Sequence, residues 1–204
     1  MSRIFLRTLM STLAVLGFAA CGPSQPGTSG PVTAVSGSAA IGGPFSLIDH
    51  HGKPVTEADF LGTPQLIYFG FAFCPDVCPT ALQQMGAALE LAGPAADHYQ
   101  PIFITIDAER DTPEQLALFV TANGFPKNLI GLTGSKEQIG AAKKTFAVYG
   151  QKVEDSSSAA GFTYDHTSMI YLMDAKGEFV DVFTHGVTPQ QIADRLISYK
   201  KTGH

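Results

Sequence analysis

Two cysteines, Cys74 and Cys78, are the side chains with the clearest capacity for chemistry. They follow an apolar run at residues 65–71 that is typical of a strand buried on both faces. Residues 81–92 then have apolar positions at helical spacing, and Pro79 is tolerated only in a helix's first turn, so the helix is expected to begin between Asp76 and Cys78. At such a junction, free N–H groups and the helix dipole favour thiolate, which attacks disulfides and binds soft metals.

The spacing of the cysteines does not decide between these uses. Three residues separate Cys74 from Cys78, whereas thioredoxin-like redox motifs carry two. The sulfurs should lie about one helical turn apart on one face. That geometry suits a redox pair, a plain structural disulfide or two thiolates that share one metal ion, and all three interpretations remain open at this point.

The first 40 residues have the pattern of an export signal followed by a tether. Residues 1–20 carry Arg3 and Arg7 before an apolar stretch, and Cys21 directly follows two alanines, which resembles the lipobox of bacterial lipoproteins. We expect lipidation at Cys21, with a cleaved soluble form or an uncleaved short anchor as alternatives. Residues 21–40 are mostly Gly, Pro, Ser, Thr and Ala, which predicts a flexible tether. The expected location is the periplasmic side of a bacterial membrane.

Residues 41–204 are expected to form one domain of the α/β class. Strands are predicted near residues 45–55 (a hairpin), 65–71, 100–107, 129–132, 148–153, 168–173 and 178–183, and helices after Asp76, Thr112, Ser135 and Thr188. This order is that of a thioredoxin-like fold, with a central mixed sheet flanked by helices, an N-terminal hairpin and a helical insertion. The net charge of −5 argues against nucleic acid as a partner.

In that fold, the predicted loop at residues 164–167 lies against the cysteine junction. His166 therefore becomes the candidate third ligand beside Cys74 and Cys78. Two thiolates and an imidazole suit copper, as Cu(I) or Cu(II), whereas structural zinc usually takes four ligands. The alternatives are a hydrogen-bonded His166 without a metal, and His185 as the ligand in its place.

Two carboxylates are candidates for residues that position the metal ligands without binding the metal. Asp107 follows the predicted strand at residues 100–107, at the edge of the sheet where active sites collect, and it is equally suited to capping the next turn. Asp165 could orient His166 as a hydrogen-bond acceptor, or it could face solvent.

Three ordered motifs resemble the Sco/SenC family of copper proteins: residues 74–79 (CPDVCP), 106–113 (IDAERDTP) and 165–167 (DHT). The resemblance implies a thioredoxin-like fold in which Cys74, Cys78 and His166 bind one copper ion, with Asp107 near the site. It also implies a role in cytochrome c oxidase assembly, either delivering copper to the binuclear centre of subunit II or reducing that subunit's cysteines. The tether differs from family members that are anchored by a full membrane helix.

Two functions from different classes follow from these expectations. One is a copper metallochaperone that binds subunit II and exchanges metal with other periplasmic copper chaperones. The other is an enzyme, a thiol:disulfide reductase whose catalytic pair is Cys74 and Cys78, served by a thioredoxin-like reductant. A purely redox protein has no need of His166. A peroxidase is a weaker third reading, because no arginine is near the cysteines in sequence.

Overall fold

The computed structural model describes residues 41–158 and 160–202. The predicted export signal, the tether and Cys21 lie outside these residues. Among the described helices, none combines the length and the hydropathy that crossing a membrane requires.

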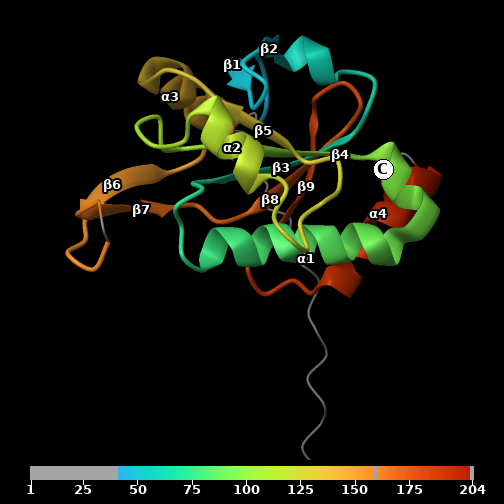
Figure 1. The fold of residues 1–204 in the computed structure, drawn as a ribbon. Helices are drawn as coiled ribbons and strands as arrows, with labels where there is room; N and C mark the ends of the chain where they lie inside the picture. Colours follow the sequence, from blue (N-terminus) through green and yellow to red (C-terminus); the bar gives the residue numbers. More distant parts are fainter. Residues whose placement is uncertain (1–40, 159, 203–204) are drawn as a thin grey trace, which may run out of the picture. The chain divides into compact units, whose positions relative to one another are not determined.

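Seven strands form one mixed sheet in the order β2-β1-β5-β4-β3-β8-β9 (Figure 1). They are β1 (Ser46–Asp49), β2 (Pro54–Thr56), β3 (Gln65–Gly70), β4 (Gln100–Thr105), β5 (Ile130–Thr133), β8 (Ile170–Met173) and β9 (Phe179–Phe183). Strands β3, β4 and β5 are parallel to one another, and the remaining pairs in this sheet are antiparallel. The predicted N-terminal hairpin and the predicted mixed sheet are confirmed.

The four longer helices begin where their capping residues predicted. They are α1 (Val77–Ala92), α2 (Pro113–Phe119), α3 (Lys136–Thr145) and α4 (Pro189–Thr202), with short 3-10 turns η1 (Glu57–Phe60) and η2 (Gly93–His98). Ser135 and Gln138 form a reciprocal capping box at the start of α3. Helix α4 lies beside α1, as Figure 1 shows.

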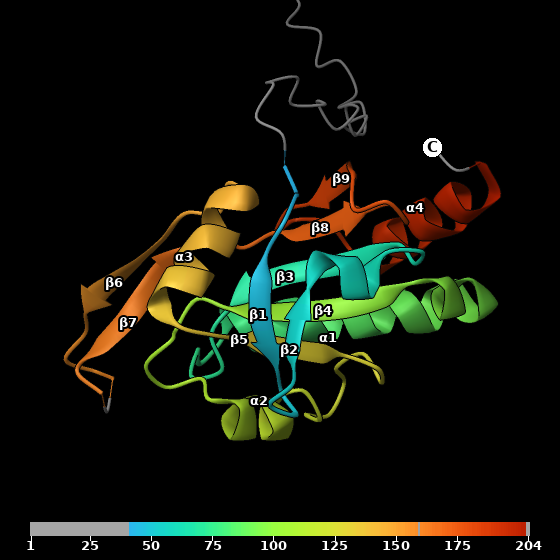
Figure 2. The same ribbon diagram turned by 90° about the horizontal axis from the view of Figure 1, so that it is seen from above.

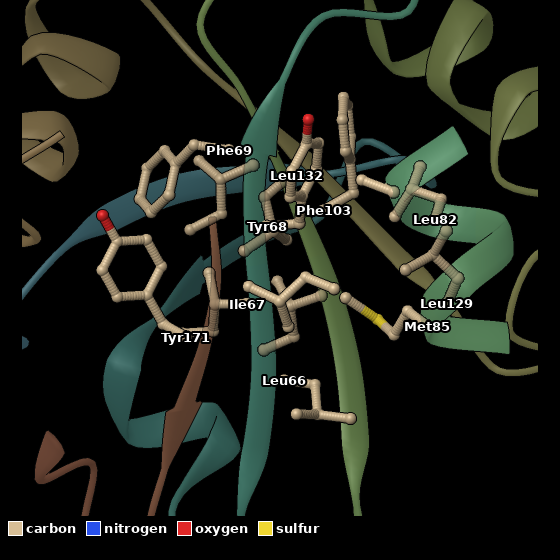
Figure 3. Close-up of a cluster of buried hydrophobic side chains, with 14 of the residues drawn as sticks. Leu66, Ile67, Tyr68, Phe69, Leu82, Met85, Phe103, Leu129, Leu132 and Tyr171 are labelled. Carbon is tan, nitrogen blue, oxygen red and sulfur yellow. The ribbon is translucent and has the colours of Figure 1, made fainter. Parts of the chain in front are cut away.

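Strand β3 is the centre of the core, because each of its six residues is buried. Its side chains alternate between the two faces of the sheet (Figure 3). Phe69 packs edge-on against Tyr171 of β8, whereas Tyr68 stacks with Phe103 of β4 on the α1 side. The strand that ends at the cysteine junction is therefore held rigidly between two layers of apolar side chains.

A second, two-stranded sheet pairs β6 (Gly150–Glu154) with β7 (Phe162–His166), and Figures 1 and 2 show it to the side of the larger sheet. The prediction of a loop at residues 164–167 is therefore wrong for the first three of these residues, which belong to β7. The insertion predicted as helical contains α3, and the short strand predicted at residues 148–153 is confirmed as β6, which pairs with β7. The sequence of β7 alternates aromatic and polar side chains, which is a strand pattern, and the neighbouring run of serines obscured it.

Candidate metal centre

The two cysteines lie where β3 gives way to α1. Cys78 is the second residue of α1 and is fully buried, whereas Cys74 lies in the preceding loop and is half-buried. Both are free thiols. The backbone N–H of Cys78 donates to Cys74 Sγ at 3.4 Å. The predicted strand-to-helix junction is confirmed. The more exposed sulfur, that of Cys74, lies just before the start of α1.

Gly70, the last residue of β3, leaves the space that the Cys78 sulfur occupies. A Cβ atom on Gly70 would lie 2.8 Å from Cys78 Sγ and 2.9 Å from Cε1 of Tyr68. Contacts this short do not occur around real Cβ atoms, so any larger residue would push one of these groups away. Sequence reasoning did not identify Gly70, although a glycine that ends a buried strand beside a cysteine pair is a usable signal.

The sulfur of Cys74, rather than the side chain of the N-cap residue Asp76, accepts a backbone hydrogen bond from the first turn of α1. Asp76 makes no side-chain capping bond. The Cys78 thiol donates to Cys74, backbone N–H groups at the start of α1 also point at this sulfur, and together they lower the pKa of Cys74 to about 5. The bond to the Cys74 thiolate, with burial, raises the pKa of Cys78 far above its usual range. These opposite shifts favour a thiolate at Cys74 and a thiol at Cys78.

His166, at the end of β7, faces the cysteines. Its Nε2 lies 3.6 Å from Cys78 Sγ, although 88 residues separate them in sequence. Its Nδ1 is 2.9 Å from the carbonyl oxygen of Thr167, and a carbonyl only accepts, so Nδ1 carries the proton of the neutral ring. Nε2 therefore presents a lone pair to the sulfur, which is the tautomer a metal ligand requires.

Two aromatic side chains pack against the imidazole of His166. The rings of Phe71 and Tyr68 meet it edge-on, with centroids 5.8 Å and 6.4 Å away. Among the described residues, no group of three or more His, Cys, Asp or Glu side chains is yet gathered closely enough to hold a metal ion. The structure thus brings Cys74, Cys78 and His166 together as neighbours. A metal would have to draw the donors inward.

Asp107 is fully buried just after β4 and has several partners. Its carboxylate accepts from the backbone N–H groups of Glu109 and Arg110, and it also pairs with the Arg110 side chain. The Tyr164 hydroxyl donates to Asp107 Oδ1 at 3.3 Å, which joins this turn to β7. Asp107 therefore caps the turn and also reaches the strand that carries His166, so both expected roles have contacts to support them.

Asp165 does not lie against the ring of His166. Successive side chains in a strand point to opposite faces, and Asp165 is exposed on the face opposite to His166. The Thr167 carbonyl occupies the position that we expected for its carboxylate. Had residues 162–166 been recognised as a strand, the alternation alone would have predicted this.

Asp111 is a buried residue that sequence reasoning missed. Its Oδ2 accepts from the Ala72 N–H at 2.8 Å and from the Thr105 hydroxyl at 2.5 Å, which ties the cysteine loop to β4. Burial raises the pKa of Asp111 to about 6. Only its position after the capped turn of the IDAERDTP motif could have suggested it.

The other histidines that the structure describes lie outside this site. His185 is exposed between β9 and α4, and His98 is exposed at the end of η2. The Nδ1 atom of His50 accepts from the Gly131 N–H at 3.1 Å, so His50 secures the β1–β2 turn against β5.

The sequence profile described as SCO1/SenC matches residues 33–201. The chain belongs to the SCO1/SenC family. Protein sco1 of Schizosaccharomyces pombe is 41% identical to this SCO1/SenC protein over 82% of this chain and 64% of its own length. Protein SenC of Rhodobacter capsulatus is 41% identical over 88% of this chain and 75% of its own length. The chain therefore spans less than two thirds of the fission-yeast relative.

Solved structures of SCO1/SenC relatives agree with the thioredoxin-like fold. ScoI of Bradyrhizobium japonicum, solved with copper bound, is 42% identical and superposes with a TM-score of 0.70. The superposition covers 78% of this chain and 99% of ScoI. The fold expected from the order of strands and helices is confirmed.

Proposed function

We propose that this protein is a copper metallochaperone that delivers copper to, or prepares, the binuclear copper site of cytochrome c oxidase subunit II. One observation carries the proposal: the lone pair of His166 Nε2 faces Cys78, and Cys78 bonds to the Cys74 thiolate. Two sulfurs and one imidazole are a donor set that suits soft Cu(I) and also tolerates Cu(II). The copper-bound ScoI relative supports the same cargo.

The donors fit copper as a cargo that is taken up and then released. Cys74 is already a thiolate and His166 already has the required tautomer, so Cys78 is the one donor that must lose a proton on binding. Three protein donors leave the ion open to a fourth from a partner. Cys74 is half-buried, which lets a thiol or imidazole of subunit II approach from its side.

The ligand set is tested by metal binding under reducing, oxygen-free conditions. Cys74→Ser, Cys78→Ser and His166→Ala should each lose tight binding, whereas the unaltered protein binds one Cu(I) per chain in preference to equimolar Zn(II). Affinity is measured by competition with a chromophoric Cu(I) chelator. His185→Ala is the matched control and should bind as the unaltered protein does. Full affinity in the His166→Ala protein would falsify the three-donor site.

A thiol:disulfide reductase is the second candidate, and the lowered pKa of Cys74 favours it. The Cys74 thiolate would attack a substrate disulfide, and Cys78 would then attack Cys74, releasing the substrate as a dithiol and leaving the protein as a disulfide. Metal-free exchange with an oxidised subunit II domain that is insensitive to His166→Ala would favour reduction. If the reduced protein shows no disulfide exchange, the reductase function is rejected and copper delivery is the function that remains.

We also propose that the chain is lipidated at Cys21 and held on the periplasmic side of a bacterial membrane. The support is the order of Arg3 and Arg7, the apolar stretch to Ala20 and then Cys21. Metabolic labelling with a palmitate analogue should mark the unaltered protein and not a Cys21→Ser variant. Absence of label from both proteins would reject the lipid anchor.

A further inference from the structure

His166 is not carried by the seven-stranded sheet that fixes the cysteines. It ends β7, in the separate two-stranded hairpin that Figure 2 shows to the side of the larger sheet. The position of the imidazole relative to Cys78 therefore depends on whatever holds this hairpin to the body of the domain.

One short segment, Asp107, Glu109 and Arg110, makes three contacts with the hairpin. We name this segment the clasp. The Tyr164 hydroxyl donates to Asp107 Oδ1 at 3.3 Å. The Arg110 guanidinium lies over the ring of Phe162, 4.1 Å from its centroid.

The third contact is the ion pair between Lys152 Nζ and Glu109 Oε2, at 2.7 Å. Lys152 Nζ also lies 3.6 Å from the centroid of Phe162, on β7. Lys152 and Glu109 are exposed, so their ion pair contributes little. The hydroxyl bond to a buried carboxylate and the stacked guanidinium are the stronger attachments.

The clasp is itself anchored in the body. Asp107 is fully buried, and its backbone N–H donates to Thr105 Oγ1 of β4 at 2.9 Å. The Arg110 side chain is 16% exposed and pairs with Asp107. The hairpin is therefore attached to a fixed point next to the end of β4.

Phe162, Tyr164 and His166 alternate along β7 and so share one face of the strand. A shift of the hairpin by one residue would turn all three away from the domain together. Holding Phe162 and Tyr164 against the clasp therefore fixes both the face and the position of His166.

We propose that the clasp positions His166 against the cysteine pair, and that Tyr164 and Phe162 are positioning residues for the metal site although neither would bind the metal. This inference rests on the proposed function, because the imidazole matters only if His166 is a ligand. It predicts that copper affinity depends on the contacts between the clasp and β7 as well as on the three donors.

The test uses Tyr164→Phe, Phe162→Leu and the double variant in reduced protein. In the metal-free state, NMR should show nuclear Overhauser effects between the rings of His166 and Phe71. We expect these to weaken in the double variant, with Cu(I) affinity about ten-fold lower, because both the hydroxyl bond to Asp107 and the ring under Arg110 are lost. Tyr164→Phe alone keeps the ring and should show a smaller change of the same sign.

Tyr149→Phe is the matched control. Among the described residues its hydroxyl donates to Gln151 of the hairpin and to no residue of the clasp, and its ring is exposed, so ring contacts and affinity should stay unchanged. Unaltered Overhauser effects and unaltered affinity in a folded double variant would overturn the clasp, even if His166→Ala abolishes copper binding. Full copper binding by His166→Ala would instead overturn the three-donor site, while the Overhauser effects would still report whether the clasp positions the ring.

Discussion

Cys74 and Cys78 differ in acidity because they share one proton within one hydrogen bond. Cys74 receives donors from Cys78 and from the start of α1, whereas Cys78 is fully buried and acts as the donor. A single cysteine pair thus divides into an accessible thiolate and a sheltered thiol. Spacing alone did not predict which sulfur would take which form.

Alkylation of the reduced, metal-free protein should show this division. With a pKa lowered to about 5 from the ordinary 9.0, Cys74 is thiolate from mildly acidic pH upward. The iodoacetamide rate should therefore rise through pH 5 and be level near neutral pH, with one adduct per chain on Cys74. Mass spectrometry of peptides gives the site and the rate. A rate that still climbs between pH 7 and pH 9, or early adducts on Cys78, would contradict the assignment.

At the scale of elements, the site depends on how closely β3 approaches α1. Gly70→Ala should displace the Cys78 sulfur or the Tyr68 ring, because the added Cβ has no free space. We expect a loss of about 1–3 kcal/mol in the free energy of unfolding, as for other overpacked cores. Cu(I) affinity should also fall. Urea denaturation and chelator competition measure the two effects.

Gly140, in α3, provides the control for Gly70. A Cβ there would meet nothing within 4 Å, so Gly140→Ala should leave copper binding unchanged and slightly raise stability through better helix propensity. If Gly70→Ala matches Gly140→Ala in both measurements, close approach at the end of β3 is not what seats the sulfur.

Over the whole molecule, local sequence patterns predicted the main sheet, the four longer helices and the cysteine junction. The capping residues Thr112 and Ser135 and the apolar run of β3 carry their information within a few neighbouring positions. His166 was placed near the cysteines through the topology of the fold, and its ring does face Cys78.

What the sequence did not predict are contacts between distant segments. Tyr164 donates a hydrogen bond to Asp107, 57 residues away in sequence, and no local sequence pattern predicts such a bond. Of the two roles left open for Asp165, the structure shows the one that faces solvent, and the choice could not be made while β7 was taken for a loop. The hairpin has little core of its own, so its hydrophobic pattern is weak, and only its tertiary partners reveal its role.

The pairing of β8 with β3 also determines when the site can form during folding. Tyr68 pairs with Ile170 across this antiparallel junction, and β8 follows His166 in sequence. A chain synthesised only as far as β5 already has both thiols but lacks the imidazole. Closing so long a loop is a slow, late event in folding. The cysteines therefore exist first as a bare thiol pair, and the complete set of donors is a property of the finished fold.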